Sequence, residues 1–185
     1  TESYIKDFLK NNQINSISPS EDFEKFSNYC LIYKEYKNTQ FELDDISTGK
    51  SQGIDGIGVI VNGELVNEID EIEDLVETNR YLEASFIFIQ SKTSTKFEGS
   101  EIGNFIFSIK DFFSSISSIR NEDIDHFLEI KTAIYDKSPN MSKGKPICKI
   151  YYVTTGEWNE SNNLRPVIEQ GRSELKATNY FKEVY

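Results

Sequence analysis

Two short segments of this chain combine residue types that could hydrolyse a phosphodiester bond. Gly53-Ile54-Asp55-Gly56 places a carboxylate where an apolar run begins, and a second apolar run, residues 86–92, ends in Gln90 and Lys92. A carboxylate can bind a divalent cation, and the small glycines beside Asp55 let cation and phosphate come close. Lys92 would position and polarise the attacking water, and Gln90 would orient the metal or its water shell. The pattern therefore predicts a metal-dependent phosphodiesterase, with nuclease as the leading function.

The spacing of these residues is compatible with a single site. Gln90 and Lys92 lie two apart on a predicted strand, so their side chains point to the same face. Asp55 precedes Gln90 by 35 residues, which leaves room for a hairpin strand and a connecting segment between them. A purely structural interpretation stays open. In that interpretation Asp55 is a turn residue before a strand, and Gln90 and Lys92 mark the point where the next strand emerges into solvent.

Glu24, on a helix predicted near the N-terminus, is the candidate second acid. Magnesium keeps several of its waters and needs only one or two carboxylates, so Asp55 with one further acid is chemically sufficient. The predicted cofactor is therefore Mg²⁺ or Mn²⁺, with Asp55, Gln90 and Glu24 around it and Lys92 as the catalytic lysine. The alternative for Glu24 is a solvated surface acid, because helix geometry alone does not turn it towards the core.

Other chemistries are poorly supported by the residue types. The glycines around Asp55 follow G-x-x-G-x-G with no helix directly after them, unlike the dinucleotide fingerprint, and the sequence contains no P-loop motif. Two cysteines and one histidine cannot supply the four ligands of a structural zinc site. His126 is the single histidine and lies in an acidic stretch, so we expect a structural or exposed role for it and no histidine-based triad.

Charge argues against extended contact with nucleic acid. The formal net charge is −11, residues 1–80 hold 17 acidic and 7 basic residues, and seven acids with no base fall between Glu64 and Glu77. A protein that coats a phosphate backbone should carry clustered Lys and Arg. Phosphate binding would then depend on a local patch, on metal ions or on another part of a larger protein.

Length and composition predict one folded domain over residues 1–185. A chain of 185 residues, 37% hydrophobic and 13% aromatic, can bury a full core. The longest apolar runs are far shorter than a membrane span, and the N-terminus lacks the basic and apolar regions of a signal peptide. Cys30 and Cys148 lie in apolar contexts, which predicts two buried thiols and fits a cytoplasmic protein. The first residue is not Met, so we expect a piece cut or processed from a longer parent.

Apolar periodicity predicts helices along most of the chain. Ser18-Pro19-Ser20-Glu21 is a helix start, and the helix should run to about Tyr36. Its predicted buried stripe consists of Phe23, Phe26, Cys30 and Tyr33. Gly99 and Ser100 precede another long helix, with an inner face that extends from Ile102 as far as Ile116. Further helices are predicted over residues 3–13, 71–79, 121–136 and 164–179.

The remaining apolar runs predict strands and a fold class. Asn62-Gly63 between apolar runs is a strong hairpin signal, because both turn residues need positive φ. Residues 84–92 are nearly continuously apolar, which is typical of a central strand buried on both faces. Strands are predicted over residues 54–61, 64–67, 84–92 and 147–154, with weaker signals at 39–45 and 181–185. The order of elements predicts an α/β domain with a small mixed β-sheet and helices on both faces.

Taken together, these motifs resemble a known superfamily. Phe23-Glu24 on an early helix, Gly53-Ile54-Asp55 opening a strand and Gln90-Ser91-Lys92 ending the next are similar to the PD-(D/E)xK nucleases, in the Mrr-like variant with Gln in place of the middle acid. Residues 54–57, the Asn62-Gly63 hairpin, residues 86–98 and residues 150–156 resemble more closely the N-terminal domain of abortive-infection phage resistance (AIPR) proteins. The resemblance covers nearly the whole chain and implies a larger parent protein.

The resemblance implies a restriction-endonuclease-like fold and a role in bacterial anti-phage defence. It implies that Asp55 is a metal ligand, that Gln90 lies beside the metal, that Lys92 is the catalytic lysine and that Glu24 is the early-helix acid. The expected substrate is nucleic acid, with DNA ahead of RNA, held with help from the rest of the parent or by a homo-oligomer. The alternative is a catalytically inactive module of the same fold that oligomerises or senses a phage component. The net charge favours this alternative, and the co-occurrence of Asp55, Gln90 and Lys92 favours the nuclease.

Overall fold

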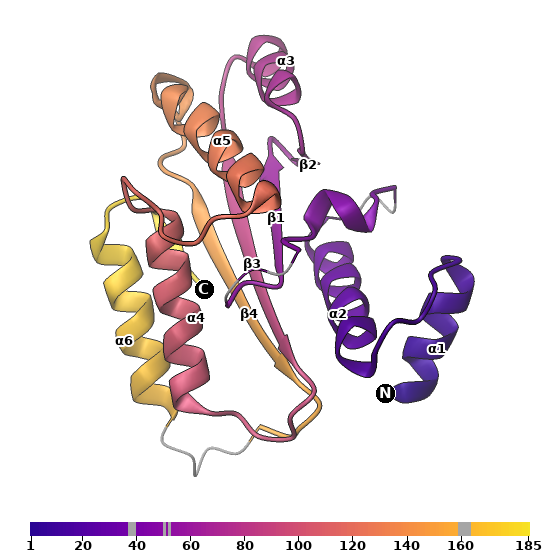
Figure 1. Cartoon of the computed structure of the whole chain (residues 1–185). Coiled ribbons are helices and arrows are strands. Elements are labelled where there is room, and N and C mark those ends of the chain that lie inside the picture. The colour runs from indigo at the N-terminus through magenta and orange to yellow at the C-terminus, as the bar shows by residue number, and fades with distance from the viewer. Residues whose placement is uncertain (37–39, 50, 52, 159–163) are drawn as a thin grey trace.

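The protein folds as a mixed five-stranded sheet with helices on both faces, which confirms the predicted α/β class (Figure 1). The computed structural model describes residues 1–36, 40–49, 51, 53–158 and 164–185. The sheet order is β2-β1-β3-β4-β5, formed by Glu64–Leu65, Gly56–Val61, Ala84–Lys92, Ile147–Thr154 and Glu183–Val184. The pairings β2–β1 and β1–β3 are antiparallel, whereas β3–β4 and β4–β5 are parallel.

Two layers of helices cover the sheet. The helices α1 and α2 (Glu2–Asn11 and Pro19–Glu35) lie on one face, and α4, α5 and α6 (Gly99–Phe112, Glu122–Asp136 and Leu164–Ala177) lie on the other (Figure 1). A short acidic helix, α3 (Ile69–Asn79), packs beside α5 at one end of the molecule. Among the described residues, no helix is long and apolar enough to cross a lipid bilayer.

The central strand β3 holds the two layers together, because its side chains alternate between two apolar clusters. Phe86 and Phe88 point into the large core beneath α4, α5 and α6. Ile87 and Ile89 point the other way, where they meet Ile32 of α2. The predicted burial of this strand on both faces is therefore confirmed. Its last residues, Gln90 to Lys92, lie at one end of the sheet.

The Asn62-Gly63 hairpin is also confirmed. Both residues adopt positive φ (52° and 94°), and β2 pairs with β1 directly after the turn. Tyr180 to Tyr185, a weak strand signal in the sequence, supplies the edge strand β5. The predicted strand at 39–45 is wrong for its described part. There the chain forms a 3₁₀ turn, η1 (Leu43–Ile46), because Glu42 and Asp45 cap each other's backbone amides.

Two helix predictions need correction. The helix α4 ends at Phe112, and Ile116 is 85% exposed instead of lying on its inner face. The Asp111 carboxylate accepts hydrogen bonds from Ser117 and Ser118, which folds the serine-rich segment into a loop. Such side-chain bonds compete with the helical backbone ladder.

The buried face of α2 also differs from the predicted stripe. Phe23 is buried as expected, but Cys30 and Tyr33 are exposed, and the other buried positions include Ser27, Asn28 and Ile32. The helix packs on the glycine-rich strand β1, where small and polar side chains fit. Of the two cysteines predicted to be buried, only Cys148 is.

Candidate active site at the start of β1 and the end of β3

The antiparallel pairing of β1 with β3 brings the predicted residues to one end of the sheet. Gly56 pairs with Ile89, and the Asp55 amide donates to the Ile89 carbonyl oxygen at 2.8 Å, so Asp55 lies opposite Gln90. Lys92 follows two residues further on, at the last position of β3. The segments that the sequence separated by 35 residues therefore form one local structure.

Asp55 is held by the backbone and side chain of Ser91. Its Oδ2 accepts from the Ser91 amide at 2.6 Å and from the Ser91 hydroxyl at 3.2 Å. Burial raises the pKa of Asp55, while these two hydrogen bonds and the nearby charge of Lys92 oppose the shift. Sequence reasoning missed Ser91, although it stands between the two residues that were selected.

Glu24 reaches the same site from α2. Burial, and then the negative charges of Asp55 and Glu21, raise the pKa of Glu24 to about 7, while Lys25 and Lys92 act in the opposite direction. The negative charge of Asp55 thus raises the proton affinity of Glu24, and a cation bound beside the two acids would offset this repulsion. Glu24 is thus neither remote from Asp55 nor a fully solvated surface acid.

Gln90 is 2% exposed, and its Oε1 has no hydrogen-bond partner within the described residues. The one other buried side-chain atom in this condition, over the same residues, is Oδ1 of Asn28. The Asn28 Nδ2 donates to the Asp55 carbonyl oxygen at 2.8 Å, so both unpaired oxygens belong to neighbours of Asp55. Buried polar atoms in native proteins are normally paired with protein, water or ions. Both unpaired acceptors thus belong to residues that border Asp55, one across the β1–β3 pairing and one hydrogen-bonded to its carbonyl group.

Lys92 forms an ion pair with Glu101, in the first turn of α4, at 3.3 Å. Both side chains are more than one-third exposed, so the pair orients Lys92 more than it stabilises the fold. Tyr152 of β4 lies across from Gln90, and burial together with the charges of Glu101, Glu98 and Asp55 raises its pKa to about 12. Glu101 and Tyr152 were not selected from the sequence, since no motif joins them to Asp55.

The donor set fits a hard divalent cation that keeps much of its water. Nowhere in the described part of the chain do three or more His, Cys, Asp or Glu side chains come together as a metal-binding group. Glu24 and Asp55 could supply two carboxylates, and Gln90 could supply an amide oxygen that has no partner among the described residues. Mg²⁺ binds in this way, through one or two carboxylates and several waters.

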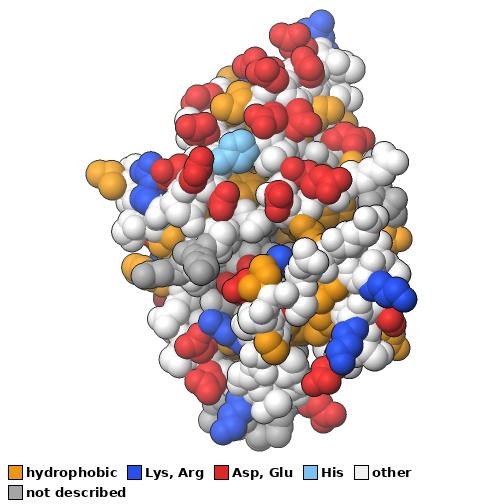
Figure 2. All heavy atoms as spheres, turned by 45° about the vertical axis from the view of Figure 1, so that its right-hand side comes forward, with side chains coloured by type: hydrophobic (Ala, Val, Ile, Leu, Met, Phe, Trp, Pro, Cys, Tyr) orange, Lys and Arg blue, Asp and Glu red, His pale blue; other side chains and the backbone are white. Residues whose placement is uncertain are grey.

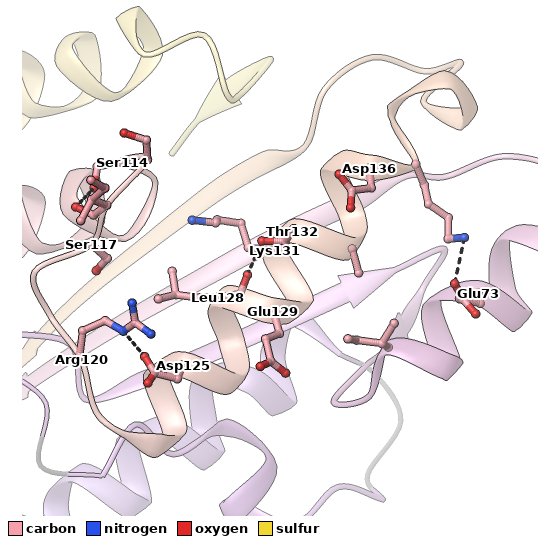
Figure 3. A pocket seen from close by; sticks show the side chains of 15 residues that line it. Glu73, Ser114, Ser117, Arg120, Asp125, Leu128, Glu129, Lys131, Thr132 and Asp136 are labelled. Carbon is pink, nitrogen blue, oxygen red and sulfur yellow. Dashed lines mark hydrogen bonds and ion pairs between the residues drawn. The ribbon is translucent and has the colours of Figure 1, made fainter.

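A cavity of about 240 Å³ lies beside Glu24 and Asn28, with Glu21, Lys25 and Asp44 also in its wall. A larger hollow of about 780 Å³ lies between α5, α3 and the loop after α4 (Figure 3). It contains none of the predicted site residues, and its basic side chains are already engaged within the protein. Arg120 pairs with Asp125, and Lys131 donates to the Phe112 carbonyl oxygen.

His126 lies outside the candidate site. Its Nε2 is 2.6 Å from the Asn67 carbonyl oxygen, which ties α5 to the segment before α3. Acidic side chains gather around this histidine on the face shown in Figure 2.

Comparison of the chain with protein-family models, with characterised proteins and with solved structures gave no match. Function is therefore inferred from the geometry and chemistry of Glu24, Asp55, Gln90 and Lys92.

Proposed function

We propose that this protein is a restriction-endonuclease-like domain that hydrolyses phosphodiester bonds in nucleic acid with Mg²⁺ or Mn²⁺. One observation carries the proposal: two carboxylates from different elements, Glu24 and Asp55, lie near enough to the strand-end Lys92 for its charge to oppose the rise of both pKa values. Gln90, opposite Asp55, adds a buried amide oxygen that has no partner among the described residues. This is the constellation that the resemblance to PD-(D/E)xK nucleases and AIPR proteins implies, and a role in anti-phage defence is part of the proposal.

Each residue has a distinct task in this proposal. Asp55, Glu24 and Gln90 would hold the metal, which when bound polarises the phosphate and stabilises the leaving oxygen. Ser91 fixes the orientation of the Asp55 carboxylate through its amide and hydroxyl. Lys92 would position the attacking water, and Glu101 keeps the lysine side chain at the site before substrate arrives.

A second candidate is a catalytically inactive module of the same fold that binds a protein partner. The observation that favours it is charge. The formal net charge is −11, and acidic side chains dominate the region of α3 and α5 (Figure 2). Such a surface repels a phosphate backbone and would fit a basic protein surface.

The decisive experiment compares cleavage of DNA and RNA by the purified 185-residue chain, with Mg²⁺, with Mn²⁺ and with chelator. We expect divalent-dependent cleavage that is lost in Lys92→Ala. A matched control is Lys143→Ala, which removes an exposed lysine that also pairs with a glutamate but lies away from Asp55. Cleavage that persists in Lys92→Ala would refute the assignment, and no cleavage of either substrate by wild type would favour the inactive module.

A further inference from the structure

Asn28 is a buried amide on α2 at the point where this helix meets β1. It is 4% exposed and lies one helical turn after Glu24. Its Nδ2 donates to the Asp55 carbonyl oxygen at 2.8 Å. The Asp55 amide in turn donates to the Ile89 carbonyl oxygen, so the Asp55 backbone is tied to α2 on one side and to β3 on the other.

The contact between Asn28 and β1 is close. A Cβ placed on Gly56 would lie 2.7 Å from the Cγ, Nδ2 and Oδ1 atoms of Asn28, so the flat amide rests on the glycine. One turn later, a Cβ on Gly58 would lie 2.4 Å from Cδ1 of Ile32. The helix thus packs on two successive glycines, with a polar residue at the Asp55 end and an apolar residue at the other.

Burying the Asn28 side chain costs more folding free energy than burying the Ile32 side chain. The Asn28 Oδ1 has no partner among the described residues, and a buried unsatisfied acceptor costs about 1–3 kcal/mol, against about 0.5–1.5 kcal/mol gained from the Nδ2 bond. An apolar side chain would fill the same space without this cost, as Ile32 does on Gly58. Packing alone therefore does not account for an amide at this position.

We propose that Asn28 is a positioning residue that fixes the offset between Glu24 and Asp55 and thereby sets the affinity of the site for a divalent cation. This inference rests on the proposed function, because it assumes that the two carboxylates share a metal. Glu24 and Asn28 belong to one rigid helix, so the hydrogen bond to the Asp55 backbone holds the helix in register with the strand that carries the other acid. Residues that orient metal ligands commonly change metal affinity when they are replaced.

The test is Mn²⁺ affinity, measured on the full chain by the electron paramagnetic resonance signal of the free ion. Asn28→Leu occupies about the same space but removes the hydrogen bond to the Asp55 carbonyl oxygen. We expect Asn28→Leu to bind Mn²⁺ about tenfold more weakly, which is the lower end of the range for residues that orient metal ligands. Its free energy of unfolding should equal or exceed that of wild type, because the unsatisfied buried oxygen is removed. The matched control is Ile32→Val, which trims the neighbouring helix–glycine contact and should leave Mn²⁺ affinity unchanged.

A double-mutant cycle separates positioning from a general effect. If Asn28 acts through Glu24, then Asn28→Leu should have no further effect on Mn²⁺ affinity in the Glu24→Gln background. Unchanged affinity in folded Asn28→Leu, additive effects in the cycle, or an equal loss in Ile32→Val would each overturn the inference and leave the proposed function standing. Wild-type protein that binds no Mn²⁺ would overturn both. If Asn28→Leu does not fold, Asn28→Ala decides by the same criteria.

Discussion

In the proposed metal site, Asp55 and Glu24 would determine how tightly a cation is held. Both pKa values are raised, chiefly by burial, and the charge of Asp55 also raises that of Glu24. Gln90 would offer only a neutral amide oxygen at a position where many metal sites have a third negatively charged ligand. Hard cations depend on ligand charge, so this donor set should give modest affinity.

We therefore expect weak binding of Mg²⁺ and Mn²⁺, with a dissociation constant on the order of 1 mM, as for other sites with few charged ligands. Asp55→Asn should abolish binding, because it removes the charge of one of only two acids in the proposed ligand set. Titration calorimetry checks this, with Asp123→Asn, in the first turn of α5, as a control for the loss of one negative charge. Tight binding that survives Asp55→Asn would contradict the assignment.

Glu24 also gives a prediction for stability against pH. Its pKa is raised in the folded state to about 7, so the folded protein holds a proton that the unfolded chain releases between about pH 4.5 and 7. Stability therefore falls as pH rises through this window. Glu24→Gln, which stays neutral, should be more stable than wild type above pH 7, by about 1 kcal/mol once solvent screening of the half-buried side chain is allowed for.

Urea unfolding in the presence of chelator, at pH 4 and pH 8, measures this difference. The advantage of Glu24→Gln should appear at pH 8 and vanish at pH 4, where both states of wild type are protonated. Equal stability of the two proteins at pH 8 would show that Glu24 is not desolvated in solution.

The sequence predicted some of these residues and not others, for a physical reason. Asp55, Gln90 and Lys92 stand at strand boundaries, where a polar side chain breaks an apolar run and becomes visible in one dimension. Asn28 and Glu101 lie on amphipathic helices among other polar residues. Asn28 contacts Asp55, 27 residues further along the chain, and Glu101 contacts Lys92, 9 residues before it. The spacing of apolar residues in the sequence does not predict such contacts.

At the scale of elements, the contact between α2 and β1 sets the position of Glu24 relative to Asp55 in the proposed site. The glycine-rich start of β1 allows the helix to approach closely enough for Asn28 to reach the Asp55 backbone. The sequence analysis assigned Gly56 to the approach of metal and phosphate. In the structure, Gly56 makes room for the helix.

This contact yields a prediction for Gly56→Ala. The new methyl group would collide with the Asn28 amide and displace its hydrogen bond, so the free energy of unfolding should fall by about 2–3 kcal/mol, as in other overpacked cores. Gly58→Ala should cost less, because its methyl group meets only the flexible end of Ile32. Chemical denaturation compares the two variants.

A second substitution tests the cause. Replacing Asn28 with Ala removes the obstructing amide, so Gly56→Ala should be better tolerated in the Asn28→Ala background than in wild type. An equal cost of Gly56→Ala in both backgrounds would show that the strain comes from the backbone of β1 and not from the helix.

Element prediction succeeded where periodicity was long and failed where side chains compete with the backbone. The strands β1, β3 and β4 were found because their apolar runs suit a sheet with both faces covered. The 3₁₀ turn at Leu43–Ile46 and the early end of α4 were missed, since each depends on carboxylates that bind nearby amides and hydroxyls. The buried face of α2 was missed because a helix on glycines can bury small polar residues.

At the scale of the whole molecule, charge limits what the chain can do alone. Its formal net charge is −11, and the acids of α3 and the start of α5 lie together on one side (Figure 2). A metal ion can neutralise one phosphate locally, but it cannot provide the extended basic footprint that holds a nucleic acid.

We therefore expect this chain to bind nucleic acid with an affinity weaker than about 1 μM at ~0.15 M salt, since few phosphate contacts can release counterions. Fluorescence anisotropy with labelled DNA and RNA, over a range of salt concentrations, measures it. Glu73→Lys with Glu77→Lys on α3 should strengthen binding at low salt if repulsion is the cause. Submicromolar binding by wild type at physiological salt would mean that its own surface suffices.

The exposed position of Cys30 has a practical consequence. Cys148 is fully buried, and burial places its thiol pKa far above the usual range, so at neutral pH a maleimide should couple to Cys30. Cys30 lies on α2, two residues after Asn28 and six after Glu24. A nitroxide or dye can thus be attached to the natural sequence, with no cysteine replaced. The label would report directly whether this helix shifts when a cation arrives.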